Sequence, residues 1–205
     1  MADYVTLAEF KNNSELIGYA FADYDAQLAI SAASNGIEQY CGRRFNLDTS
    51  GTNVRYYSVT EPRELNIDDI VCTSYGATVQ VDVDGDGVFE TTWVRNTDFF
   101  LEPLNAQADG WPYETIRVSP RSAQRFPSWP RSVQVTGQFG WPAVPQNVKE
   151  ATMIMSVRLM KRAREAPFGV AAIGFDGAAV RVARVDPDVA FLLDNWVRGY
   201  QVLVG

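Results

Sequence analysis

The sequence contains no histidine, and this absence removes several classes of enzyme. Without histidine there is no Ser-His-Asp or Cys-His nucleophile, no imidazole proton shuttle and no zinc site with a histidine ligand. Mechanisms that use only carboxylates, lysine or tyrosine remain open. Carboxylate pairs such as Asp68 and Asp69 are explained by turns and caps, because sequence spacing says nothing about the separation in space that glycosidase chemistry requires. We expect no enzymatic activity and no cofactor.

Long apolar runs are also missing from the chain. No stretch approaches the roughly 20 consecutive apolar residues that a membrane-spanning helix requires. The first residues, MADYVTLAEF, contain neither a basic leader nor an apolar signal core. We therefore expect a soluble protein with no membrane partner, made and used without export.

Cysteine and positive charge are both scarce. Cys41 and Cys72 lie in unrelated contexts, so buried free thiols are favoured over a disulfide. The chain has 18 Lys and Arg against 25 Asp and Glu, a formal net charge of −7. This balance argues against broad affinity for nucleic acid, which comes mainly from neutralising phosphates. An acidic protein can still surround DNA if its task is to let DNA pass without adhesion.

An amphipathic helix is the clearest element that is present. From Asp25 to Cys41 the apolar and small residues recur at spacings of three and four, with Asp23 expected as the N-cap. Gly42 suits the left-handed residue that closes a helix. The rest of the helix is slim, which would let another helix or a neighbouring subunit approach closely. The small residues concerned are Ala29, Ala32 and Gly36.

Three further helices are expected. Thr6 and Glu9 form a capping box for a short helix over 7–11, which the polar residues 12–14 should interrupt. A second long helix begins near Gln146, with Asn147 as its cap, and stops before Pro167. The final helix starts at 186–187, where an aspartate precedes a proline suited to the first helical position.

Between the two long helices the composition changes to β-branched and aromatic residues punctuated by turn formers. The expected strands are 54–60, 66–73, 78–83, 88–94, 99–101, 114–119 and 132–138. The clearest hairpin is TVQVDVDGDGVFETTWV, in which two alternating runs flank a glycine-containing turn. The predicted fold class is α+β: a small helical bundle, 1–53 and 143–205, interrupted by a large antiparallel β insertion, 54–142.

The turn of this hairpin has two interpretations. Asp82, Asp84 and Asp86 resemble the opening of a calcium loop, in which alternating carboxylates converge on a hard cation. An EF-hand loop also requires a glutamate at its twelfth position, which is Trp93 here, and flanking helices rather than strands. An acidic hairpin tip is therefore favoured, with calcium as the alternative.

The stretch from 111 to 130 is rich in Trp, Pro and Arg and is expected to be largely an ordered loop. Its aromatic residues and those that follow could form a platform for sugar or single-stranded nucleic acid, but neighbouring prolines favour packing. Arg121 and Arg125 could pair with carboxylates of a neighbouring subunit or remain on a solvated face.

Three stretches occur in a characteristic order: TLAEF near the start, a helix from Asp25 that ends in CGRRF at Phe45, and GWPAVPQNVKEA from Gly140. In this order they resemble the head-to-tail connector proteins of tailed bacteriophages, the adaptor family that forms a ring under the portal. The resemblance is strongest over 4–45 and 137–165.

The resemblance implies a structural virion protein without catalytic activity. Such a protein would form a ring of about twelve copies beneath the portal protein. The ring would extend the channel for double-stranded DNA without sequence-specific binding, and would offer a docking surface to a stopper or tail-completion protein. It would be assembled in the host cytoplasm and located in the head–tail neck of the virion. The alternative function is an acidic calcium- or carbohydrate-binding β module.

The resemblance also implies two sets of contact residues. The C-terminal segment would engage the portal through Phe191, Leu192, Trp196, Val197, Tyr200, Val202 and Leu203. Contacts between subunits are expected at Ala29, Ala32, Gly36, Arg43, Arg44, Arg121 and Arg125.

Overall fold

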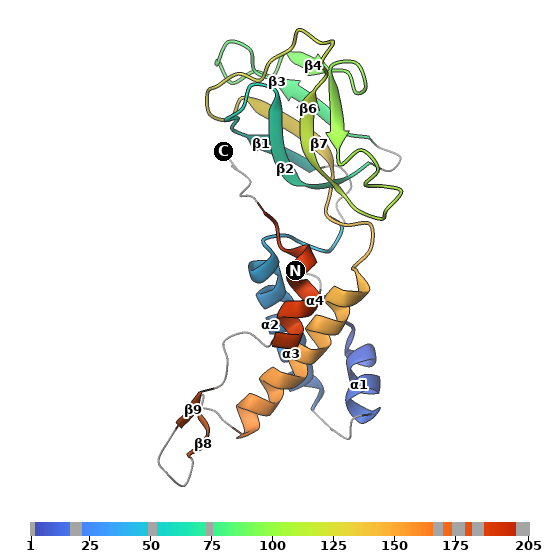
Figure 1. Cartoon of the computed structure of the whole chain (residues 1–205), viewed down its shortest axis with the longest axis vertical. Coiled ribbons are helices and arrows are strands. Elements are labelled where there is room, and N and C mark those ends of the chain that lie inside the picture. The colour runs from blue at the N-terminus through green and yellow to red at the C-terminus, as the bar shows by residue number, and fades with distance from the viewer. Residues whose placement is uncertain are drawn as a thin grey trace. The chain divides into compact units, whose positions relative to one another are not determined.

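The computed structural model describes residues 3–16, 22–48, 53–72, 76–165, 170–173, 179–181 and 187–199. The chain divides into two compact units (Figure 1). The helical unit comprises Met1–Phe45 and Val144–Arg198, and the β unit contains Asn46–Ala143. Within the described ranges, no helix combines the length and the apolar character needed to cross a membrane.

The helical unit is built from α1 (Leu7–Leu16), α2 (Asp23–Cys41), α3 (Gln146–Glu165) and α4 (Pro187–Leu193). A short 3-10 helix, Asp194–Trp196, continues from α4, and strands β8 (Val170–Ile173) and β9 (Ala179–Arg181) form a two-stranded antiparallel sheet. Helix α2 packs against α3, and α3 packs against α4 (Figure 1).

The helix starts confirm one predicted cap and correct two others. The Thr6 hydroxyl accepts the Glu9 amide at 3.2 Å and the Glu9 carboxylate accepts the Thr6 amide at 2.8 Å, so the capping box is present. Helix α2 begins one residue early, with Ala22 as N-cap and no capping side chain, so Asp23 lies in the first turn. Asn147 lies inside α3, because the Pro145 carbonyl accepts the amides of Val148 and Lys149.

The ends of the helices also differ in part from expectation. Helix α1 continues to Leu16, because the asparagines expected to interrupt it have a modest helix penalty rather than a breaking effect. Gly42 closes α2 at φ 64° and its amide donates to the Glu38 carbonyl, as predicted. Pro187 is the first residue of α4, while the expected cap at 186 lies outside the described residues.

The β unit confirms the seven predicted antiparallel strands. They are β1 (Asn53–Tyr57), β2 (Glu64–Val71), β3 (Thr78–Val81), β4 (Thr91–Trp93), β5 (Phe99–Glu102), β6 (Tyr113–Val118) and β7 (Val133–Phe139). Their order is β4-β3-β7-β2-β6-β5, with β1 also paired to β7. The predicted hairpin joins β3 and β4, with Val81 opposite Thr91. Strand β7 holds the sheet together because it pairs with β1, β3 and β2.

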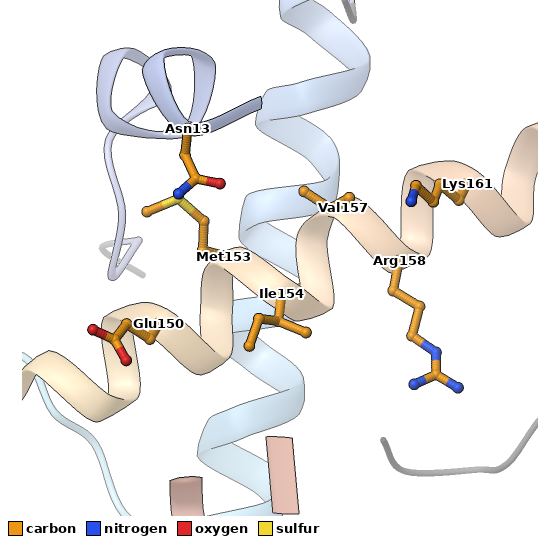
Figure 2. A pocket seen from close by; sticks show the side chains of 7 residues that line it. All are labelled: Asn13, Glu150, Met153, Ile154, Val157, Arg158 and Lys161. Carbon is orange, nitrogen blue, oxygen red and sulfur yellow. The ribbon is translucent and has the colours of Figure 1, made fainter. Parts of the chain in front are cut away.

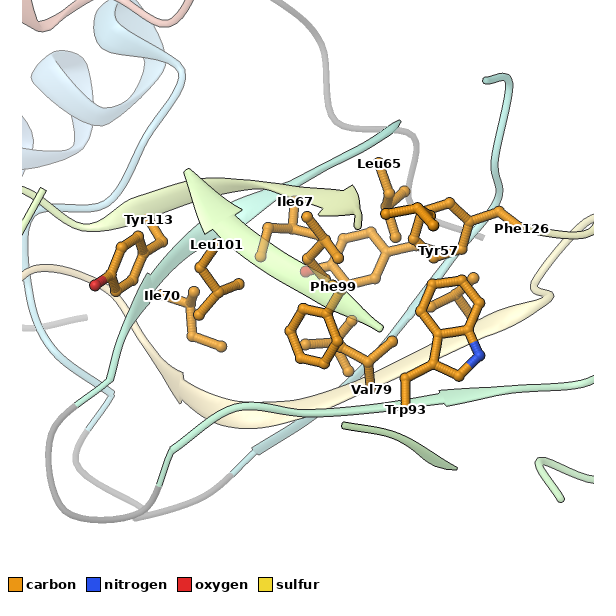
Figure 3. Packing of buried hydrophobic residues seen from close by; sticks show 14 of the residues in the cluster. Tyr57, Leu65, Ile67, Ile70, Val79, Trp93, Phe99, Leu101, Tyr113 and Phe126 are labelled. Atoms are coloured by element: carbon orange, nitrogen blue, oxygen red, sulfur yellow. The ribbon is translucent and has the colours of Figure 1, made fainter. Parts of the chain in front are cut away.

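The core of the β unit is aromatic and aliphatic. Figure 3 shows its side chains gathered between the strands, with Phe99 and Ile67 completely buried. Trp93 and Phe126 stack with ring centroids 4.6 Å apart. Phe126 therefore anchors the loop between β6 and β7 by packing, and this loop does not need regular structure to be ordered.

The helical unit has its own core. Residues from three helices meet in it: Phe10 of α1, Ala26 and Ile30 of α2, and Val157 and Met160 of α3. The Met155 side chain fills the space beside Gly36, since a Cβ there would lie 2.8 Å from the Met155 methyl carbon. Small residues on α2 thus serve packing between helices of the same chain.

The two ends of the β unit are joined by a clamp, formed by residues 46–48 and 139–141. Gly140 has φ 110°, and a Cβ at this position would lie 2.1 Å from the Asn46 carbonyl oxygen. The Asp48 amide donates to the Phe139 carbonyl at 2.8 Å, and the buried Trp141 indole donates to the Asp69 carboxylate at 2.8 Å. The clamp explains why glycine and tryptophan begin the motif GWPAVP.

Candidate functional site

Helix α4 presents one large apolar side chain to solvent. Val189 and Leu193 are buried in the helical unit, whereas Phe191 is 83% exposed. Leu192 is half-buried and Val197 is exposed. Among the residues expected to contact a portal, Phe191 is therefore the one most available, and Tyr200, Val202 and Leu203 lie outside the described residues. We call the exposed side of α4, with Phe191 at its centre, the α4 surface.

The segment after α4 is attached to the end of α2. The Trp196 ring meets the Phe45 ring edge-on at 6.2 Å, and Phe45 in turn meets the Tyr4 ring at 5.8 Å. The Arg198 amide donates to the Cys41 carbonyl at 2.8 Å. Trp196 thus helps hold α4 in place, in addition to any contact that it makes with a partner.

The residues expected between subunits differ in accessibility. Ala29 and Arg43 are buried, and Gly36 lies against Met155, so contacts within the chain cover these three. Ala32 and Arg44 are exposed. Arg121 and Arg125 are exposed in the loop after β6. A neighbouring subunit can therefore reach four of the seven predicted residues without rearrangement: Ala32, Arg44, Arg121 and Arg125.

Two exposed apolar features of the helical unit were not among the predicted contacts. Tyr24 and Leu28 are 79% and 61% exposed on α2. On α3, a groove of about 590 Å³ has an apolar floor and charged ends (Figure 2). Its lining consists of Asn13, Glu150, Met153, Ile154, Val157, Arg158 and Lys161. We call these features the α2 stripe and the α3 groove. The signal for the stripe was present in the sequence, since residues four apart share a helix face.

The tip of the β3–β4 hairpin gathers four carboxylates. One oxygen from each of Asp82, Asp84, Asp86 and Glu90 lies within 4.8 Å of the others. Asp82 is buried, and its two oxygens accept the Gly85 and Gly87 amides at 2.7 and 3.0 Å. Glu90 was missed by the sequence comparison with an EF-hand, because only the twelfth position was considered beyond the three aspartates.

Two chemical roles are compatible with this tip. Oxygen ligands at such separations are the kind that hard cations such as calcium prefer. The same carboxylates also support the loop backbone, since the oxygens of Asp84 and Asp86 accept the amides of Asp86 and Val88 at 3.3 and 2.8 Å. The hydrogen bonds therefore account for the turn without an ion.

The aromatic residues considered as a platform are mostly internal. Tyr113, Phe126, Phe139 and Trp141 are buried. Trp111 is half-buried, and its ring centroid lies 5.0 Å from that of Trp141. Packing is therefore the role of these side chains, as the neighbouring prolines indicated.

Both cysteines are free and buried, as predicted. Burial raises the pKa of the Cys41 thiol to about 12 and also raises the pKa of the Cys72 thiol. The neutral thiol is thus favoured at both positions, so neither has the thiolate character that a nucleophilic cysteine requires.

Solved structures with the same fold come from a phage-like particle. A chain of "Neck of empty GTA particle computed with C6 symmetry" matches with a TM-score of 0.56 and 17% identity, covering 98% of this chain and 93% of that chain. A chain of "Virion of native gene transfer agent (GTA) particle" matches with a TM-score of 0.55 and 20% identity at the same coverage. No protein-family model and no curated protein matches the sequence. The resemblance to head-to-tail connectors is confirmed at the level of the fold.

Proposed function

We propose that this chain is a structural protein of the head–tail neck of a phage-like virion, an adaptor that forms a ring beneath the portal protein. The observation that carries the proposal is the shared fold over 98% of the chain with a protein from a particle neck. The three sequence motifs give independent support, because they resemble the same class of protein. No catalytic or cofactor-dependent role is part of the proposal.

In this function the α4 surface docks on the portal, and another surface of the ring receives the stopper or tail-completion protein. Phe191 is the expected anchor, since large exposed aromatic side chains dominate the energy of protein interfaces. The net charge of −7 suits a channel wall along which DNA slides, because few phosphates would be neutralised. The similar neck structure was computed with sixfold symmetry, and a ring of twelve identical copies also has a sixfold axis.

The docking experiment uses the full chain and its cognate portal protein. Purified protein mixed with portal at micromolar concentration should form a ring-shaped complex in electron micrographs. Phe191→Asp should abolish this complex, because it places a charge at the centre of an apolar contact. Leu104→Asp is the matched control, since Leu104 is 75% exposed in the β unit and should tolerate the change.

Deletion of the C-terminal segment is a less informative test than the point variant. Removal of everything after Arg184 would also remove the buried Val189 and Leu193, and the helical unit would lose part of its core. Failure of the unaltered protein to bind portal would contradict the proposal. Normal docking of Phe191→Asp would remove the α4 surface from the list of contacts.

The alternative function, a calcium-binding β module, is favoured only by the four carboxylates of the hairpin tip. It predicts that millimolar calcium raises the Tm of the protein, and that Asp84→Ala abolishes this shift. An equal Tm in calcium and in chelator would exclude the alternative. If calcium raises the Tm and the protein also binds portal, the chain would be an adaptor that the ion stabilises rather than a protein with a separate function.

A further inference from the structure

The helical unit carries two unlike surfaces, the α2 stripe and the α3 groove, on two helices that pack against each other. The buried stripe of α2 contains Ala26, Ile30 and Ala33, which pack in the helical unit. At 3.6 residues per turn, Tyr24 and Leu28 lie about half a turn from this stripe. The α2 stripe is therefore an apolar ridge directed away from the helices of its own chain.

The α3 groove lies at the edge of the helical core, since Val157 of that core forms part of its floor. Ile154 is 38% exposed, and Val157 and Met153 form an apolar floor beside Asn13 of α1. In Figure 2, Ile154 and Arg158 project from the same side of α3. The α3 groove is thus a concave apolar surface on α3, the helix that packs against α2.

The charges around the two surfaces are complementary. The exposed Asp25 stands beside the α2 stripe in the first turn of the helix. Arg158 and Lys161 border the α3 groove toward the C-terminal end of α3, while Glu150 lies toward its start. Helix α2 contains no basic residue, so a second α2 stripe would offer Asp25 no cation, whereas the basic end of the α3 groove does. The α2 stripe therefore fits the α3 groove better than it fits a second stripe.

We propose that the α2 stripe of one copy docks in the α3 groove of the next copy, with Leu28 against Ile154 and Asp25 toward Arg158. The helices run antiparallel in this contact, because Asp25 precedes Leu28 whereas Arg158 follows Ile154. A contact between two unlike surfaces of a subunit is heterologous and repeats from copy to copy, which is how closed rings are built. The interface rests on the proposed ring function and identifies the surfaces that would make it.

Cysteine cross-linking tests this contact directly. Leu28→Cys and Ile154→Cys are made separately and in one chain, and the native cysteines stay in place because both are buried. Each single variant should remain monomeric under mild oxidation. A mixture of the two single variants should give a disulfide-linked dimer and nothing larger. The double variant should give a ladder of oligomers that ends at a closed ring.

Leu104→Cys provides the matched control, since Leu104 is exposed in the β unit and lies on neither surface. Its mixture with Leu28→Cys should give no dimer above background. Melting curves of all variants would establish that each one is folded. The reactions are run at high micromolar concentration and again with portal present, so that a ring that forms only on the portal is also detected.

Two results would overturn the interface. Self-linked dimers of either single variant would show a contact between like surfaces. Absence of the mixed dimer, both free and on the portal, would show that the surfaces do not meet. Either result with normal portal docking would leave the neck function intact, whereas mixed dimers without portal docking would support the interface and contradict the adaptor function.

Discussion

At Gly140 the backbone conformation and the surrounding atoms leave no room for a side chain. Its φ of 110° lies in a region that side chains rarely adopt, and the space a Cβ would need is filled by the Asn46 carbonyl. The obstacle is backbone rather than a flexible side chain, so it cannot move aside without disturbing the clamp. Trp141, the next residue, is fixed by its hydrogen bond to Asp69.

Gly140→Ala should therefore lower the free energy of unfolding of the β unit by about 3 kcal/mol or more. Gly110→Ala separates backbone strain from collision, since Gly110 also has positive φ but nothing lies within 4 Å of its missing Cβ. That control should cost only about 1 kcal/mol. Urea unfolding followed by tryptophan fluorescence measures both, and equal losses would show that the contact with Asn46 is unimportant.

The buried thiol of Cys41 should give a pH dependence. Its pKa rises from an ordinary 9.0 to about 12 on folding, so the unfolded chain releases the proton at lower pH than the folded chain. The contribution of the neutral Cys41 thiol to the free energy of unfolding is fully present below the pKa of this thiol in the unfolded chain. It is lost as the pH rises toward 12. The buried Tyr4 and Tyr57 hydroxyls, whose pKa values burial also raises, act in the same direction.

We expect the Tm to fall between about pH 8 and about pH 11, and Cys41→Ser to weaken the dependence, because one titrating group is removed. Neither thiol should react with Ellman's reagent near neutral pH unless denaturant is present. Rapid labelling of Cys41 in the native protein would contradict the buried position.

At the residue scale, the sequence could predict what depends on neighbours along the chain. Thr6 with Glu9 and the glycine after Cys41 act within one turn of helix, and both predictions were correct. The caps at Asp23 and Asn147 were misplaced because the helices begin one and two residues earlier, at Ala22 and Pro145. The reason for Gly140 could not be predicted, since its obstacle, Asn46, is distant in sequence.

At the scale of elements, the β3–β4 hairpin depends on the side chain of Asp82. Its carboxylate accepts two backbone amides of the turn from a buried position. Hydrogen bonds to a buried charged group are worth more than neutral ones, because a lost partner leaves polar groups unsatisfied. In the sequence this turn is a row of similar acidic residues, whereas in the structure one of them, Asp82, supports the backbone of the turn.

Asp82→Ala should destabilise the β unit by about 2 kcal/mol, because two amides of the turn lose their acceptor. Asp84→Ala should cost much less, since Asp84 is exposed and accepts one long hydrogen bond of 3.3 Å. Thermal melts in chelator, which removes any bound cation, measure the difference. Similar losses for the two variants would contradict a special role for Asp82.

The positions of the strands were predictable, but their pairing was not. Alternation of side chains and turn residues marks each strand locally, which is why all seven were found near their observed bounds. The pairing of β7 with β1, β2 and β3 joins segments separated by tens of residues. Only the β3–β4 hairpin could be paired in advance, because its partners are adjacent in the chain.

At the scale of the whole molecule, the two units have separate cores. Among the residues that the structure describes, the hydrophobic cluster of the β unit contains no residue of the helices, and the cluster of the helical unit contains none of the strands. All seven strands of the β unit also lie in one continuous segment, Asn46–Ala143. A unit with its own core and one continuous chain meets the conditions for independent folding.

The isolated segment 46–143 should therefore fold by itself, with a β-type circular dichroism spectrum and a cooperative thermal transition. Gly140→Ala in the isolated segment should lower its Tm, since the clamp lies within it. A segment that remains unfolded would show that the helices supply part of its stability.

The clamp between residues 46–48 and 139–141 has a consequence for the order of folding. Helices α2 and α3 are separated by about 100 residues, and closing a flexible loop of this length costs roughly 4 kcal/mol of chain entropy. Once the β unit has folded, its two ends are already tied together at Gly140 and Asn46. The helices are then joined by the equivalent of a loop of about ten residues, which reduces this cost by about 2 kcal/mol. The folded β unit therefore holds the ends of α2 and α3 near each other. Its loops can change in length without lengthening the path between these two helices.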